Sequence, residues 1–233
     1  MRAAQSLGIR PFIILSFTAV MVLSLVYSAS FQYGHADVPV AATAQEIKPL
    51  VAGDQAPRFT VISTDGENFE FDPRSLHRPV MLISFRGGWC PYCNMHLAEL
   101  RHVLPEIADM GVDVLFLSGD RSELLVKSLS REARAVVDEL DYTLLSDANA
   151  RAAIALGIAF KASDRLIARL LEKGNDIESS SMAKHGVLPV PAVFAIDRSG
   201  TISYAHADPD YRERHSGYDV LAPARDLVQN NAS

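Results

Sequence analysis

The only two cysteines of the chain lie three positions apart in the run Trp89-Cys90-Pro91-Tyr92-Cys93, which also holds its only tryptophan. Two thiols at this spacing can pass between a dithiol and a disulfide, because residues three apart in a helix have Cα atoms roughly 5–6 Å apart, a distance that a disulfide spans. A bridge that closes so small a loop adds little stability through chain entropy. The spacing therefore indicates redox chemistry rather than a structural staple.

The segments on either side predict that this pair lies at the start of a helix. Residues 79–85 form an apolar run typical of a buried strand, and helical spacing then predicts a helix over 91–110. Pro91 suits the first helical position, where its missing N–H costs nothing. Unpaired N–H groups and the positive end of the helix dipole favour a thiolate at Cys90. We therefore expect Cys90 to be the nucleophile and Cys93 the resolving thiol.

A metal site is the alternative chemistry for these residues. His96 and His102 follow Cys90 and Cys93 along the same segment. Ligands from one helix seldom converge in tetrahedral order, and no second cysteine pair exists to complete a site. We expect neither a metal nor another cofactor.

The remaining pattern predicts an α/β fold. Apolar runs that alternate with helical segments imply a central, mostly parallel sheet flanked by helices. A hairpin around Asp65-Gly66 precedes the strand at 79–85, and residues 161–189 are expected to form a helical insertion before the strand that follows Pro191. Further strands are expected at 112–118, 141–146 and 201–205, and helices at 122–140, 148–156 and 219–228.

The first thirty residues predict export. Arg2 and Arg10 precede an apolar run over 11–27, which small residues follow, and this is typical of a signal peptide or of an N-terminal membrane anchor. We expect 1–30 to be the export segment, 31–50 a linker and 51–233 the domain. The domain would be periplasmic or bound to the cell envelope, soluble after cleavage or tethered through 11–27. A net charge of −6 without a basic stretch excludes a nucleic-acid partner.

Several separated motifs resemble the alkyl hydroperoxide reductase/thiol-specific antioxidant (peroxiredoxin-like) family of the thioredoxin superfamily. They are Gly53-Asp54-x-Ala56-Pro57-x-Phe59, Phe85-Arg86-Gly87-Gly88-Trp89-Cys90-Pro91-Tyr92-Cys93, Leu144-Leu145-Ser146-Asp147 and Asp208-Pro209-Asp210-Tyr211. The second is similar to the hallmark of a Cys-Pro-Tyr-Cys subgroup. The resemblance implies a thioredoxin fold with a mixed sheet, a cis Pro191 beside the cysteines, and supporting roles for Arg86, Trp89, Pro91 and Tyr92.

The chain departs from the family pattern at Gly87, where peroxiredoxins place a Thr or Ser that positions the peroxide. An arginine before the strand at 192–197 is also missing, and Arg86 is the candidate to supply that charge. We expect an exported thiol oxidoreductase with antioxidant activity that reduces hydroperoxides through Cys90 and Cys93. A protein-disulfide reductase is the alternative, and a redox sensor or copper-binding chaperone the second. Both enzymes need an external thiol reductant, thioredoxin-like or glutathione-like.

Overall fold

The computed structural model describes residues 39–139, 142–180, 182–213 and 216–229, and Val38–Ser233 form one compact unit. The predicted export segment, 1–30, and the first part of the predicted linker lie outside the described residues. In the described part of the chain, no helix is long and apolar enough to cross a membrane.

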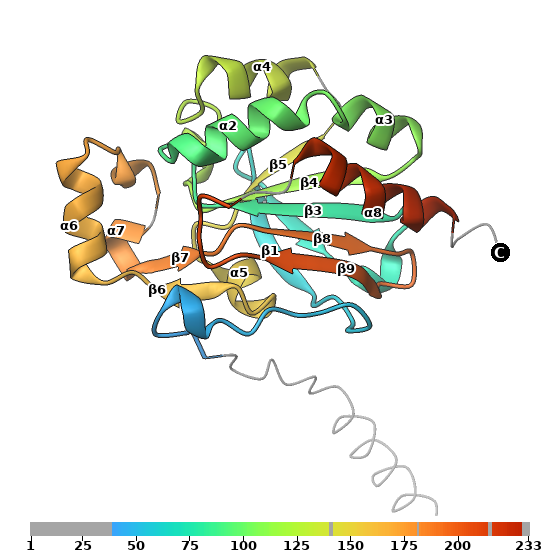
Figure 1. Cartoon of the computed structure of the whole chain (residues 1–233), viewed down its shortest axis with the longest axis horizontal. Coiled ribbons are helices and arrows are strands. Elements are labelled where there is room, and N and C mark those ends of the chain that lie inside the picture. Colours follow the sequence, from blue (N-terminus) through green and yellow to red (C-terminus); the bar gives the residue numbers. More distant parts are fainter. Residues whose placement is uncertain (1–38, 140–141, 181, 214–215, 230–233) are drawn as a thin grey trace, which may run out of the picture. The chain divides into compact units, whose positions relative to one another are not determined.

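A seven-stranded mixed sheet forms the centre of the fold, in the order β2-β1-β5-β4-β3-β8-β9 (Figure 1). Only the central pairs β3/β4 and β4/β5 are parallel; the four other neighbouring pairs are antiparallel. The predicted mixed α/β fold is confirmed, but a mostly parallel sheet is wrong. Short turns join β1 to β2 and β8 to β9, and a short turn can reverse a chain only into an antiparallel neighbour. The strands are β1 (Phe59–Ser63), β2 (Asn68–Phe71), β3 (Val80–Phe85), β4 (Asp113–Ser118), β5 (Thr143–Ser146), β8 (Ala192–Ile196) and β9 (Ile202–Ala207).

Helices cover both faces of this sheet. Figure 1 shows α2, α3, α4 and α8 above it and α5 below it. Every residue of β3 and of β8 is buried, so these two strands run through the core directly beneath the helices. The helices are α2 (Pro91–Leu100), α3 (Leu104–Asp109), α4 (Arg131–Glu139), α5 (Arg151–Ala155) and α8 (Gly217–Gln229).

The helix predicted over 91–110 is two helices, α2 and α3. Pro105 lies in the first turn of α3, where it cannot continue α2 because it lacks an N–H and its ring would strike the carbonyl four residues earlier. The helix predicted over 122–140 is also divided, into a 3₁₀ turn η3 (Ser122–Leu124) and α4. The cysteine helix is therefore short, and its first turn lies directly above the end of β3.

The predicted insertion contains helices α6 (Asp164–Glu172) and α7 (Met182–His185), a 3₁₀ turn η4 (Ile177–Ser179), and the two-stranded sheet of β6 (Ala159–Lys161) and β7 (Val187–Pro189). Part of the predicted linker belongs to the fold. Ala41 donates its N–H to Ala159 and accepts from Lys161, at 3.1 and 2.8 Å. These backbone bonds add residue 41 to the edge of β6, so 39–50 is not a free spacer.

Candidate active site

Cys90 and Cys93 lie together at the start of α2. Cys90 is the N-cap residue, with extended backbone angles, and Pro91 is the first helical residue, as the sequence predicts. The Cys90 carbonyl accepts the N–H of Cys93 at 3.0 Å, and no disulfide joins the two side chains. The two side chains are only 2% and 1% exposed. The structure thus places both cysteines in the first turn of α2, with their side chains buried.

The pKa of Cys90 is shifted in the direction opposite to the prediction. A side-chain hydrogen bond with Cys93 and burial both raise the pKa of Cys90, while the charge of Arg86 lowers it. The helix N-terminus was expected to favour a thiolate here, and the net direction is the opposite. The reason is that the hydrogen bond with Cys93 and the withdrawal of the sulfur from water both disfavour the charged thiolate.

Arg86 is a buried cation beside the thiols. Its side chain is 3% exposed, and its guanidinium carbon lies 4.2 Å from the centre of the Tyr211 ring and 5.8 Å from that of Phe160. Two aromatic faces stabilise a cation that water does not reach. The predicted role as a source of positive charge stays open to test, but a surface role is excluded by this burial.

Asp120 and Asn94 hold the turn that leads into Cys90, and sequence reasoning missed both. Asp120 is fully buried at the end of β4, and its Oδ2 accepts the Gly88 N–H at 2.7 Å. Asn94 donates from Nδ2 to the carbonyls of Gly88 and Cys90 at 2.5 and 3.1 Å, and its Oδ1 accepts the Ser130 N–H at 2.7 Å. Both polar backbone groups of Gly88 are thereby fixed.

The carboxylate of Asp120 also joins this turn to more distant segments. Oδ2 accepts the hydroxyl of Ser128 at 2.5 Å, and Oδ1 accepts that of Ser179, in the insertion, at 3.4 Å. Burial raises the pKa of Asp120, and these hydrogen bonds act against the rise. One sequence signal was available: the parallel strands β3 and β4 end side by side, so a carboxylate after β4 must lie beside a cysteine loop after β3.

Gly87 is enclosed by the same groups. Its φ is +148°, and a Cβ atom there would overlap Asp120 Oδ1 and lie 2.6 Å from Nε1 of Trp89. Trp89 is 8% exposed, and its Nε1–H has no hydrogen-bond partner among the described residues. The space in which a Thr or Ser side chain would lie is therefore already filled by the carboxylate and the indole.

The bond before Pro191 is trans, since no cis peptide occurs in the described part of the chain. The predicted cis Pro191 is wrong. The trans form of an X–Pro bond is favoured by about 0.5–1 kcal/mol. Here Val190 donates to the Ile158 carbonyl at 2.8 Å and Ala192 already pairs with Ser84 of β3, so the chain passes in extended form from β7 into β8. Pro191 still lines a small pocket with Ser84 and with His96 of α2.

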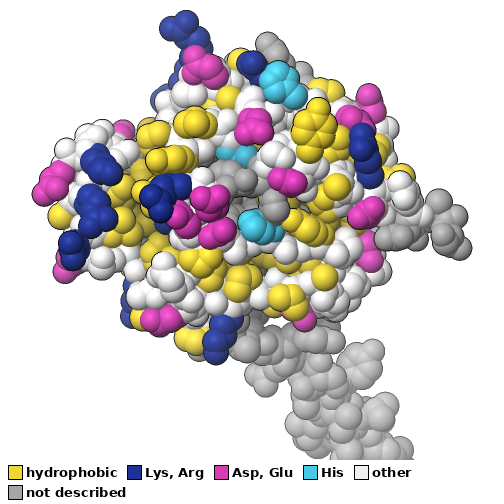
Figure 2. Space-filling view, in the orientation of Figure 1, with side chains coloured by type: hydrophobic (Ala, Val, Ile, Leu, Met, Phe, Trp, Pro, Cys, Tyr) yellow, Lys and Arg dark blue, Asp and Glu magenta, His cyan; other side chains and the backbone are white. Residues whose placement is uncertain are grey.

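The histidines of the metal alternative separate in the structure. His96 is buried and lines the pocket that Pro191 also lines. His102 is exposed, and its Nε2 accepts a hydrogen bond from Nε of Arg101 at 3.3 Å. Within the described ranges, no three His, Cys, Asp or Glu side chains are grouped so that they could hold a metal ion. Figure 2 shows histidine and acidic side chains gathered around the centre of this face of the molecule.

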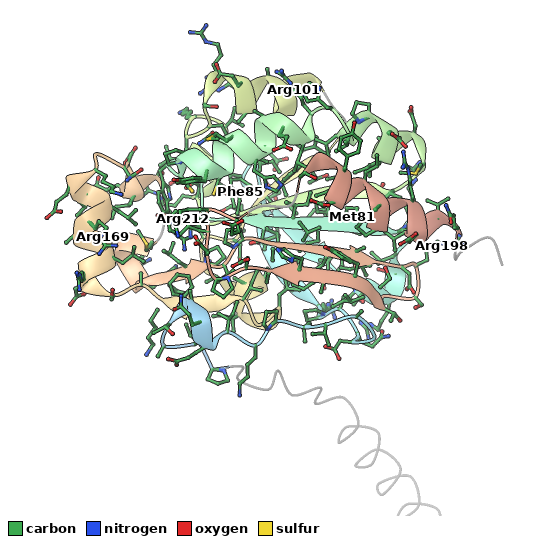
Figure 3. The ribbon with its side chains drawn as sticks, in the orientation of Figure 1. Met81, Phe85, Arg101, Arg169, Arg198 and Arg212 are labelled. Carbon is green, nitrogen blue, oxygen red and sulfur yellow. The ribbon has the colours of Figure 1, made fainter. Side chains whose placement is uncertain are left out.

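Tyr92 and the segment after β9 complete the site. Tyr92 is 39% exposed, and its ring meets that of Tyr211 edge to face, with centroids 5.6 Å apart. Figure 3 shows Arg212, the residue after Tyr211, near the end of β3 that Phe85 marks. The site thus combines two thiols, a buried cation and an aromatic cover.

Asp147 lines a second small pocket on the other side of Arg86. Its carboxylate accepts the N–H groups of Ala152 and Ala153 at 3.0 and 2.8 Å, so it caps the first turn of α5 from a position before the N-cap residue, Ala150. Burial raises the pKa of Asp147 to about 7.

A thioredoxin-type sheet with two thiols at the start of the helix after β3 defines the class: a thiol-dependent oxidoreductase. The sequence profile of the AhpC/TSA family matches residues 52–205, and the chain belongs to this family. The family resemblance of the sequence motifs is thereby confirmed.

Relatives carry both activities in their names. The chain is 22% identical to the thiol-disulfide oxidoreductase ResA of Bacillus thuringiensis (strain Al Hakam), over 71% of this chain and 75% of that one. It is 34% identical to peroxiredoxin Bcp of Escherichia coli (strain K12), over 43% of this chain and 60% of that one.

Solved structures share the fold. A peroxiredoxin-like protein from Aquifex aeolicus aligns with a TM-score of 0.59 at 18% identity, covering 81% of this chain and 98% of that one. AhpC of Mycobacterium tuberculosis aligns with a TM-score of 0.57 at 15% identity, covering 80% and 97%.

Proposed function

We propose that this protein reduces hydroperoxides through a dithiol–disulfide cycle of Cys90 and Cys93. The observation that carries the proposal is the pair of buried thiols in hydrogen-bond contact at the start of α2, with Arg86 beside them lowering the pKa of Cys90. Cys90 is the residue at the open end of the helix, and Cys93 lies one turn inside it. Cys90 is therefore assigned as the nucleophile and Cys93 as the resolving thiol.

The cycle has two covalent steps. The Cys90 thiolate attacks one oxygen of ROOH, the O–O bond breaks, and the leaving alkoxide takes up a proton as ROH while Cys90 becomes a sulfenic acid. The Cys93 sulfur then attacks the Cys90 sulfur, water leaves, and a disulfide forms. An external reductant, either one dithiol or two molecules of a monothiol, returns both cysteines to thiols and is itself oxidised to a disulfide. We propose a thioredoxin-like or glutathione-like thiol in this role.

Burial of the nucleophile favours a small oxidant. With 2% of Cys90 exposed, a hydroperoxide needs only a narrow approach to reach the sulfur, whereas the disulfide of a folded protein must bring its own backbone and side chains into contact. Arg86 contributes to this reaction by stabilising the thiolate that attacks.

One observation favours disulfide reduction as a second candidate. The turn before Cys90 offers no hydroxyl at Gly87 to position a peroxide, and Asp120 and Trp89 fill that space. In this reaction Cys90 would attack one sulfur of a substrate disulfide and release a thiol, and Cys93 would release the second. The similarity to ResA over most of the chain supports the same reading.

Stopped-flow kinetics separates the two candidates. The reduced protein is mixed with hydrogen peroxide, with an organic hydroperoxide, or with a reducible model protein disulfide, and thiol loss is followed. Hydroperoxide reduction predicts oxidation by a peroxide at least about a hundredfold faster than that of free cysteine. A peroxide rate equal to that of free cysteine, together with rapid turnover of the protein disulfide, would establish the second candidate instead.

We also propose that the domain is exported, on the strength of the two arginines and apolar run within residues 1–30. Cell fractionation, with determination of the N-terminal residue of the purified protein, tests this. A protein found in the envelope, cleaved after the apolar run or retained in the membrane, supports export; an intact chain in the cytoplasmic fraction contradicts it.

A further inference from the structure

Residues 208–213, which follow β9, lie beside the first turn of α2. Figure 1 shows this segment, in red, passing from the end of β9 toward the start of α8, by the end of β3 and the first turn of α2. Its contacts there are made by Tyr211, whose ring meets Tyr92 at 5.6 Å and Arg86 at 4.2 Å. The ring therefore spans from a residue before Cys90 to a residue after it.

The segment is braced so that Tyr211 is held in place. Asp208 accepts the N–H of Asp210 at 2.8 Å, and the Asp210 carbonyl accepts the N–H of Glu213 at 2.9 Å. The guanidinium of Arg212 also donates to the Asp210 carboxylate at 2.5 Å. A compact turn with its own hydrogen bonds thus holds the Tyr211 ring against Tyr92 and Arg86, while the Arg212 side chain is 60% exposed.

We propose that Tyr211 is a specificity-determining residue that restricts Cys90 to small substrates. With the ring between Tyr92 and Arg86, hydroperoxides reach the sulfur while bulky disulfides are excluded until the ring moves. The inference deepens the proposed function, because it names the substrate class of the same site. Tyr211 touches no reacting atom, so it is not a catalytic residue.

The ring contacts of Tyr211 indicate how strongly it is held in place over the cysteine turn. A face of the Tyr211 ring covers a buried cation, and its neighbour Tyr92 adds an edge-to-face pair. Removing the ring should raise the reactivity of Cys90 toward a bulky reagent by at least about tenfold, the factor that corresponds to about 1.4 kcal/mol of lost ring contacts. A small reagent needs only a narrow approach to the sulfur, so its rate should change much less.

Alkylation of Cys90 measures this without requiring either redox activity. In the full chain carrying Cys93→Ser, the rates of a small reagent, iodoacetamide, and of a bulky one, a maleimide attached to polyethylene glycol, are compared before and after Tyr211→Ala. Each variant is measured across pH, so that the limiting rates of the thiolate are compared. The inference predicts that the ratio of bulky to small rates rises at least about tenfold.

Two further variants control the experiment. Tyr218→Ala removes the same atoms from a ring that is 80% exposed on α8, and should leave the ratio unchanged. Tyr211→Phe keeps the covering ring and should do the same. If Tyr211→Ala does not fold, Tyr92→Ala, which removes the partner ring, must raise the ratio in its place.

An unchanged ratio in Tyr211→Ala, or an equal rise in Tyr218→Ala, overturns the inference. This outcome is distinct from failure of the proposed function. If the alkylation ratio shifts but the protein reacts with hydrogen peroxide no faster than free cysteine, Tyr211 covers Cys90 and the protein is not a peroxidase. If the ratio is unchanged but peroxide reduction is fast, the protein is a peroxidase and Tyr211 does not restrict access to Cys90.

Discussion

Replacing Gly87 by alanine tests how tightly the turn before Cys90 is enclosed. The substitution forces a side chain onto a backbone with φ of +148° and places its Cβ against Asp120 Oδ1 and 2.6 Å from Trp89 Nε1. Backbone strain of this kind costs about 1–3 kcal/mol. Overpacking against a rigid wall costs about 1–3 kcal/mol more. The two effects together predict a loss of about 2–6 kcal/mol in the free energy of unfolding.

Gly66→Ala provides the matched control. Gly66 also has a positive φ, +90°, but nothing lies within 4 Å of its missing side chain. This variant should show the strain alone, about 1–3 kcal/mol. Urea denaturation of both variants, followed by fluorescence of the single tryptophan and by circular dichroism, measures the difference. Equal destabilisation by the two substitutions would refute the enclosed turn, and with it the explanation for the missing hydroxyl.

Three other perturbations follow from the site. Burial raises the pKa of Asp147 from 3.8 to about 7, so between these pH values the folded state holds a proton that the unfolded state has lost. The free energy of unfolding should therefore fall by up to about 4 kcal/mol as the pH rises from 4 to 7. Denaturation curves of Asp147→Asn should show no such dependence on pH. Asn94→Ala removes three hydrogen bonds around the cysteine turn and should lower the free energy of unfolding, measured in urea, by about 2–4 kcal/mol. The control Asn175→Ala removes one hydrogen bond and should lower it by about 1 kcal/mol. Equal destabilisation by the two variants would contradict the role of Asn94 in holding this turn. Arg86→Gln removes the charge that lowers the pKa of Cys90, so the pH profile of Cys90 alkylation should move to higher pH; an unmoved profile would show that the cation does not act on the thiol.

The sequence was sufficient for the elements nearest the cysteines. The hairpin, the buried strand at 80–85 and the helix starting at Pro91 all lie where apolar periodicity and turn residues predict them. These features are local, since each is decided by a few neighbouring side chains. Sheet direction is not local, and the antiparallel pairing of β3 with β8 could not be obtained from either run alone.

The errors at the site have the same origin. The isomer of Pro191 depends on how β7 leads into β8, and the direction of the Cys90 pKa depends on the side-chain hydrogen bond with Cys93 and on burial in the folded chain. The hydrogen bond between Asp120 and Gly88 could not be predicted from the sequence, because only the register of β3 with β4 brings the two residues together. Motif spacing predicts the reactive thiols; their environment is set by long-range packing.

The central claim is that Cys90 attacks and Cys93 resolves. Mass spectrometry of peptides after one equivalent of hydrogen peroxide tests it most directly, in the wild-type chain and in the Cys93→Ser and Cys90→Ser variants. The claim predicts a Cys90–Cys93 disulfide in the wild type, a trapped sulfenic acid on Cys90 in Cys93→Ser, and no rapid oxidation in Cys90→Ser. A sulfenic acid that forms on Cys93 in Cys90→Ser at the wild-type rate would contradict it.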